Sequence, residues 1–257
     1  MKTPTTKKRF ISLANNSAEF LINKFIDESK DFKVSVTGYT TMIEQGKNKF
    51  FCHDSSQSGS KKKILQMRQK IIKEINNSNV TFDFVPRSKI RYYDIGNCFS
   101  ENVPQTMYNY DISAAYPSAL KKLGIIGENT FNELMKLPKV DRLKSVGAIA
   151  TRKTITEFIK GIPQDAIIKE NKLGRDIFFL LCYEIGELMW EIRQKINSFV
   201  FFWFDGIYFT DISEKEIISE IITKNGYLSK FEELKEFKVK KDFERDRIKI
   251  NYLKENK

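Results

Sequence analysis

The clearest periodic pattern of the chain lies between residues 173 and 196. Apolar side chains recur there at the three- and four-residue spacing of one buried helical stripe, formed by Ile177, Leu181, Ile185, Leu188, Ile192 and Ile196. Glu184, Glu187, Glu191 and Lys195 fall on the polar side. The pattern predicts a long amphipathic helix that opens at Leu173-Gly174-Arg175, and it is also typical of a plain core helix.

Two aromatic, strand-forming runs flank this helix. The first is Tyr108 to Asp111 and the second is Phe201 to Phe209, and each brings one aspartate, Asp111 or Asp205, to the end of a strand. An aromatic strand that ends in aspartate is also typical of a buried strand that merely meets a turn. The chain after Phe209 predicts a helix over 217–222, ended by Asn225-Gly226, and two charged strands over 231–239 and 247–253.

The first hundred residues predict a mixture of short elements. We expect a helix over 20–25, strands over 33–36, 50–52 and 80–85, and a polar loop over 54–60. A second helix opens at Lys61. Its apolar side is formed by Ile64, Met67, Ile71 and Ile75, and its basic side by Arg68, Lys70 and Lys73.

Composition restricts the class of protein. At 257 residues and 41% apolar content the chain can bury one main domain with a small appendage. No apolar run is long enough for a membrane span and the first nine residues lack the apolar core of a signal peptide, so we expect a soluble, cytoplasmic protein. Cys52, Cys98 and Cys182 are scattered, and the single histidine, His53, has no further ligands nearby in sequence, which argues against a zinc site or a disulfide framework.

Positive charge is concentrated in the first hundred residues. They hold 18 of the 44 lysines and arginines but only 9 of the 33 aspartates and glutamates. A basic block of this kind predicts binding to a polyanion through phosphate contacts, for which we select Lys61, Lys62, Lys63 and Arg68. The alternative is a lysine bias from an AT-rich genome, or a solvated helix face.

The two aspartate segments together resemble the catalytic motifs of family B DNA polymerases. Asp111-Ile112-Ser113-Ala114-Ala115-Tyr116-Pro117-Ser118 is similar to the first motif of that family, and Phe204-Asp205-Gly206-Ile207-Tyr208-Phe209 is similar to the end of the second. The family also has a helix that opens with Gly-Arg directly before the second motif, as the chain has at Gly174-Arg175. One departure is Trp203, which occupies the position of a preceding aspartate in the family.

The resemblance implies a set of roles for individual residues. Asp111 and Asp205 would bind two Mg²⁺ ions, for which Mn²⁺ can substitute, with the Ile112 main chain beside them. Tyr116 would pack under the sugar of the incoming nucleotide and reject a 2′-hydroxyl, and Ala115 would lie next to the triphosphate. The fingers would fall at about 121–172, where Lys144, Arg152 and Lys153 are the candidates for phosphate contacts, with a solvated basic helix as the alternative. Lys240-Lys241-Asp242-Phe243 is similar to the basic-x-aromatic element of the family near the primer end, so Lys240 and Lys241 are further candidates for nucleic-acid contacts. Val85 stands where the exonuclease domain of the family needs a glutamate, so we expect no proofreading.

We therefore predict an α+β fold. It would comprise a basic nucleic-acid-binding module over 1–100 and a polymerase-like palm with a mostly antiparallel sheet and short helical fingers over 101–257, without a thumb. The function predicted is template-directed nucleotidyl transfer to a 3′-hydroxyl, as in a minimal DNA polymerase or primase of a phage or mobile element. Primer-template and nucleoside triphosphates would be its partners, with another protein subunit supplying a thumb or processivity. The alternative is a catalytically silent palm that binds nucleic acid.

Overall fold

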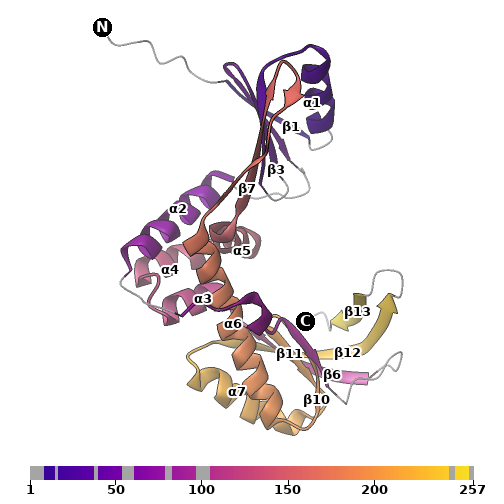
Figure 1. The fold of residues 1–257 in the computed structure, drawn as a ribbon. Helices are drawn as coiled ribbons and strands as arrows, with labels where there is room; N and C mark the ends of the chain where they lie inside the picture. The colour runs from indigo at the N-terminus through magenta and orange to yellow at the C-terminus, as the bar shows by residue number, and fades with distance from the viewer. Residues whose placement is uncertain are drawn as a thin grey trace.

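The computed structural model describes residues 9–14, 17–37, 40–53, 61–78, 83–96, 105–242 and 247–254. These residues form two β-sheets and the helices that pack on them, so the fold is α+β, as predicted. The two sheets lie at opposite ends of an elongated molecule, with α2, α4 and α5 between them (Figure 1). In this part of the chain no helix has the length and apolar character needed to cross a bilayer.

The first sheet combines strands from two distant parts of the chain. Its order is β1-β4-β3-β2-β7-β8, with β9 also paired to β7; β1 and β4 run parallel and the other pairs antiparallel. Phe32 pairs with Phe158 across β2 and β7, and their rings stack with centroids 4.2 Å apart. The strands are β1 (Arg9–Ala14), β2 (Phe32–Thr37), β3 (Thr40–Gln45), β4 (Asn48–His53), β7 (Arg152–Ile159), β8 (Ile162–Pro163) and β9 (Ile167–Glu170).

Helix α1 (Ser17–Asp27) covers the core of the first sheet. Its Phe25 packs with Phe32, Val34 and Ile43 from the strands in a cluster separate from the main core. The helix and two strands predicted in this region are confirmed as α1, β2 and β4. Strand β3 is not predicted by the sequence because only Ile43 within it is buried, which leaves little apolar alternation to recognise.

Helices α2 (Lys61–Asn77), α4 (Glu128–Met135) and α5 (Lys139–Gly147) and the 3₁₀ turn η2 (Ala148–Ala150) form a layer between the sheets. The predicted helix from Lys61 is confirmed, and its apolar side enters the main core. Arg68 Nε donates to the carbonyl oxygen of Ala148 at 2.7 Å, and the Gly127 amide before α4 donates to Glu74 at 2.7 Å. Helix α2 is thus bonded to residues that come 53 and 80 positions later in the chain.

The second sheet has the order β13-β12-β6-β11-β10-β5. Tyr110 and Ile112 of β6 point into the main core with the apolar stripe of α6, whereas Met107 lies in a small cluster made of strand residues on the other face. The described helices therefore cover one face of this sheet. Its elements are β5 (Tyr93–Ile95), β6 (Gln105–Ile112), α3 (Ala115–Lys122), α6 (Lys172–Lys195), β10 (Phe199–Trp203), β11 (Gly206–Phe209), α7 (Lys215–Lys224), β12 (Ser229–Asp242) and β13 (Arg247–Lys254), with 3₁₀ turns η1 (Arg87–Lys89) and η3 (Ile212–Glu214).

Some boundaries of the sequence prediction do not coincide with breaks in the structure. The division at residue 100 stays a prediction, but strands from 9–53 share one sheet with strands from 152–170. Within the predicted fingers range, about 121–172, only the first part is helical, because β7, β8 and β9 belong to that sheet. The strand expected over 80–85 is not formed at 83–85, and 79–82 and the loop 54–60 lie outside the described residues.

Candidate active site

Asp111 lies near the end of β6, the strand at the centre of the second sheet. It pairs with Gly206 of β11 on one side and with Lys230 of β12 on the other. Neighbouring strands on both sides fix the backbone of Asp111 by ladder hydrogen bonds. Because Gly206 has no side chain, the carboxylate of Asp111 has no cross-strand side chain against it on the β11 side.

Asp205 lies in the tight turn between β10 and β11. Its carbonyl oxygen accepts a hydrogen bond from the Ile112 amide at 2.9 Å, which ties the turn to the end of β6. The preceding Phe204 amide donates to the carbonyl oxygen of Tyr92 at 2.8 Å. The structure thus brings the two predicted carboxylates close together, with Asp111 near the end of β6 and Asp205 in the turn before β11, its neighbouring strand.

The backbone beside each aspartate has an unusual conformation. Phe204 has φ 53° and Ala114 has φ 50°, so both are non-glycine residues in the left-handed region. Such residues cost on the order of 1–3 kcal/mol each and persist where the surrounding structure holds them, often at functional sites. Ala114 allows the chain to turn from β6 directly into α3, and the Ser113 amide in this turn donates to the Leu228 carbonyl at 2.7 Å.

The environment of Asp205 disfavours its charged form. Burial raises the pKa of Asp205 to about 6, and the nearby Asp111 carboxylate adds to the rise. Lys139, the first residue of α5, opposes this shift, and its Nζ lies 4.0 Å from Oδ2 of Asp111. Since the Lys139 side chain is 73% exposed, one solvated ammonium only partly compensates two adjacent carboxylates.

Tyr116 lies behind Asp111 and Asp205, the two aspartates that we call the acid pair. Its ring stacks on Phe178 of α6 with centroids 5.8 Å apart, and its hydroxyl is hydrogen-bonded to the thiol of Cys182. Burial raises the pKa of Tyr116 strongly, and Cys182 and Asp205 add to this effect. The hydroxyl therefore stays protonated near the Asp205 carboxylate, and the ring forms a rigid wall of the site.

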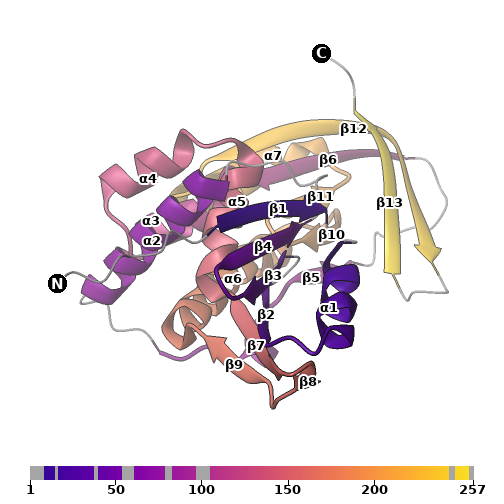
Figure 2. The same ribbon diagram turned by 90° about the horizontal axis from the view of Figure 1, so that it is seen from above.

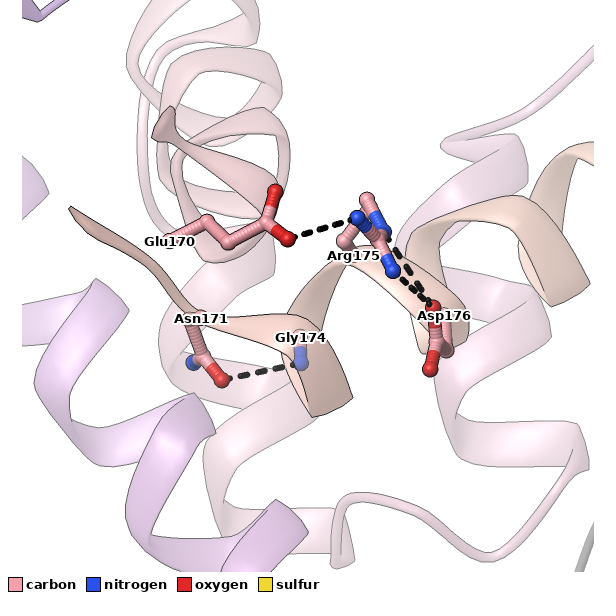
Figure 3. A network of polar contacts seen from close by, with 5 residues as sticks. All are labelled: Glu170, Asn171, Gly174, Arg175 and Asp176. Atoms are coloured by element: carbon pink, nitrogen blue, oxygen red, sulfur yellow. Dashed lines mark hydrogen bonds and ion pairs between the residues drawn. The ribbon is translucent and has the colours of Figure 1, made fainter. Parts of the chain in front are cut away.

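Helix α6 is positioned by its first turn, which is drawn in Figure 3. The Asn171 side chain caps the helix by accepting from the Gly174 amide at 3.1 Å. Arg175 is bound by Glu170 at 2.8 Å and by Asp176 at 3.2 Å. A Cβ at Gly174 would lie 2.3 Å from the carbonyl oxygen of Ile149, so the glycine lets α6 pack directly on η2. The Gly-Arg pair thus places the helix that carries Phe178 and Cys182.

Other predicted site residues lie elsewhere or have other partners. The Ile112 amide is used by Asp205, so only its carbonyl oxygen could reach a metal ion. Ala115 is buried at the start of α3. Lys144 is five residues beyond Lys139 on α5, a rotation of about 140° around the helix, so the two lysines face different ways. Arg152 and Lys153 belong to β7 in the first sheet, not to the sheet that holds the acid pair.

The predicted nucleic-acid contacts are also distributed differently. Arg68 is half-buried, and its Nε is bonded to the carbonyl oxygen of Ala148. Lys63 is exposed on α2, whereas the side chains of Lys61 and Lys62 lie outside the described part. Lys240 and Lys241 are in β12, where only the backbone is described. All of these nucleic-acid contacts stay predictions.

Sequence reasoning missed Lys139, Phe178 and Cys182. Lys139 follows Pro138 at the start of a helix, and no spacing in the sequence relates it to Asp111. Phe178 and Cys182 are four residues apart on α6, which is the same-face spacing that could have indicated a shared contact.

The acid pair fits a magnesium site in which the protein supplies only one or two ligands to each ion. Among the described residues no group of three or more His, Cys, Asp or Glu side chains could hold a metal ion. Mg²⁺ is commonly held by one or two carboxylates, with water and substrate phosphates at its other positions. Two adjacent carboxylates, one with a raised pKa, match this preference because a divalent cation would relieve their repulsion.

Comparison with known proteins identifies no relative. The chain matches no protein-family model, and neither the curated proteins nor the solved structures contain a significant match.

Proposed function

We propose that this chain catalyses template-directed nucleotidyl transfer to a 3′-hydroxyl, as a minimal member of the family B polymerase type. The observation that carries the proposal is the adjacency of Asp111 and Asp205, delivered by neighbouring antiparallel strands, with the pKa of Asp205 raised to about 6. Perturbed carboxylates that meet in this way are typical of functional sites. The order of the motifs along the chain supports the same function.

Each residue would act on a defined part of the reaction. The 3′-hydroxyl attacks the α-phosphorus of the nucleotide, and pyrophosphate leaves. Asp111 and Asp205 would hold divalent ions, which supply charge neutralisation and lower the pKa of the attacking hydroxyl. Lys139 lies close enough to the pair to attract triphosphate oxygens. The Tyr116 ring, fixed by Phe178, would limit the space at the 2′ position of the sugar.

A primer-extension assay tests this function. Wild-type protein is incubated with primer-template and deoxynucleotides in Mg²⁺, in Mn²⁺ and in EDTA, and one lane omits the primer. We expect metal-dependent extension that Asp111→Asn and Asp205→Asn each reduce by at least about 10³-fold, because each removes a charge on which the metal site depends. Asp165→Asn, at an exposed residue before β9, is the matched control and should extend normally. Extension that survives both substitutions would exclude the acid pair.

A second function, nucleic-acid binding without catalysis, is favoured by the aromatic pair beside the site. Trp203 stacks on Tyr93 with ring centroids 5.8 Å apart, and the two residues are 47% and 60% exposed. Exposed aromatic rings suit stacking with bases, and Trp203 stands where the family has another acid. Absence of extension with any metal, together with sequence-independent binding that Trp203→Ala weakens, would establish this function instead.

A further inference from the structure

A pocket of about 480 Å³ opens between α2 and α4. Helix α2 and the end of α4 lie side by side in both views (Figure 1 and Figure 2). The volume falls within the range of small-molecule sites. The lining side chains are Lys63, Gln66, Met67 and Lys70 from α2, and Glu133, Lys136 and Leu137 from α4 and the segment after it.

The charges around this pocket favour an anionic ligand. Three lysines stand against one glutamate, a net charge of +2. Lys70 is already paired with Glu133 at 2.6 Å, which leaves the excess positive charge on Lys63 and Lys136. Arg68 on the same helix donates to the carbonyl oxygen of Ala148 and does not line the pocket.

The uncharged side chains that line the pocket could contact parts of a ligand other than its phosphate. Met67 is 7% exposed and belongs to the main core, and Leu137 packs against that core. They form an apolar floor on which a base or sugar could lie. Gln66 adds an amide with both donor and acceptor atoms, as the edge of a base requires. A cationic rim, an apolar floor and one amide together match a nucleotide.

The pocket is also close to the acid pair along the chain. Lys136 lines it, and three residues later Lys139 lies 4.0 Å from Asp111. The Cα atoms of Lys136 and Lys139 are therefore at most about 11 Å apart, and each lysine side chain extends beyond its own Cα. A strand that reaches Asp111 could therefore place a nearby nucleotide in the pocket.

We propose that this pocket binds an unpaired nucleotide of the template strand, ahead of the site of synthesis. Lys63 and Lys136 contact its phosphates, Gln66 contacts its base, and Met67 and Leu137 support the ring. The choice of the template strand rests on the proposed function, whereas the choice of a nucleotide rests on the pocket itself.

Binding to two matched DNA substrates tests the proposal. Fluorescence anisotropy in EDTA compares a duplex that has a single-stranded 5′ overhang with a blunt duplex of the same paired sequence. Lys63→Gln with Lys136→Gln should weaken binding to the overhang substrate and lower its salt slope by about 0.7 per phosphate contact on a single strand. The same variant should bind the blunt duplex as tightly as the wild type does. Equal losses on both substrates, or no loss on the overhang substrate, would overturn the proposal.

Two further variants test whether the loss of binding comes from this pocket. Lys195→Gln with Lys224→Gln removes the same charge from the ends of α6 and α7, and we expect no overhang-dependent change. Gln66→Ala should weaken overhang binding by about 2- to 10-fold, the effect of one lost hydrogen bond. If Gln66→Ala changes nothing, the pocket recognises phosphate alone and the nucleotide assignment is wrong.

Failure of the proposal and failure of the proposed function give different results. Normal extension by wild type without the overhang-specific loss would reject the pocket and keep the function. An overhang-specific loss in a protein that shows no metal-dependent extension would keep the nucleotide pocket and reject the function.

Discussion

At the scale of single residues, Asp205 combines a place in the proposed metal site with a cost to stability. Its folded-state pKa of about 6 lies above the ordinary value of 3.8, so the folded protein binds this proton more tightly than the unfolded chain. The contribution of Asp205 to stability is therefore most favourable below about pH 4, falls between about pH 4 and 6, and stays unfavourable above that range.

Asp205→Asn should consequently stabilise the protein at pH 7 without divalent metal. We expect a gain on the order of 1–2 kcal/mol, seen as a higher Tm, because the variant removes a buried charge next to Asp111. The difference in Tm between the variant and the wild type should disappear at pH 4. Thermal unfolding at both pH values measures it, and added Mg²⁺ should raise the Tm of wild type more than that of the variant. A variant that is no more stable than wild type at pH 7 would contradict the charge repulsion.

The ring of Tyr116 gives a second prediction at this scale. Wild type should prefer deoxynucleotides if the ring occupies the space of a 2′-hydroxyl. Tyr116→Ala should reduce that preference by about 10-fold or more, since a steric exclusion worth at least 1.4 kcal/mol is lost. Tyr116→Phe keeps the ring and should behave as wild type. Steady-state incorporation of matched ribo- and deoxynucleotides measures the ratio, and efficient use of ribonucleotides by wild type would favour a primase.

At the scale of elements, α6 links the first sheet to the acid site. It begins directly after β9, packs on η2 through Gly174, and carries Phe178 and Cys182 to Tyr116. The long helix follows from local periodicity and is confirmed, beginning at Lys172, one residue before the predicted Leu173. The role of Gly174 could not be predicted from that pattern, because the carbonyl it faces belongs to Ile149, a residue brought there by tertiary packing.

Gly174→Ala should destabilise the protein by about 1–3 kcal/mol, since the new Cβ would lie 2.3 Å from the Ile149 carbonyl oxygen. Gly147→Ala is the matched control. Gly147 is helical, with φ −58°, and a Cβ there meets nothing within 4 Å, so alanine should be neutral or stabilise by up to about 1 kcal/mol. Urea unfolding at one pH gives both values. Equal effects of the two substitutions would show that α6 can shift away from η2 without loss.

At the scale of the whole molecule, the described residues hold two separate larger cores. One lies beneath α1 and the first sheet, and the other joins α2, α6 and α7 to the second sheet. The α+β class could be predicted because its signals are local, and so could helices α1, α2, α6 and α7 and strands β2, β4, β6, β10, β11, β12 and β13. The sharing of the first sheet by 9–53 and 152–170, and the approach of Lys139 to Asp111, could not, because they depend on contacts between distant segments.

Ile43→Ala tests how independent the two cores are. Ile43 is fully buried in the first core, and its truncation should cost about 2–5 kcal/mol. Hydrogen exchange should then show faster exchange in β1–β4 and also in β7–β9, while β6, β10 and β11 keep their protection. Protection retained in β7–β9 would mean that these strands are held by α6 and the helical layer, not by β2. Uniform loss everywhere would mean that the whole molecule unfolds as one unit.

The composition of the first sheet also determines when it can form during protein synthesis. Strand β2 is complete once Thr37 has been added, but its partner β7 ends only at Ile159, more than a hundred residues later. At roughly 5–20 residues per second, a ribosome needs on the order of 6–24 s to make that stretch. During this interval the edge of β2 that later pairs with β7 has no partner strand, so the nascent chain exposes a β-edge that chaperones or other chains can bind.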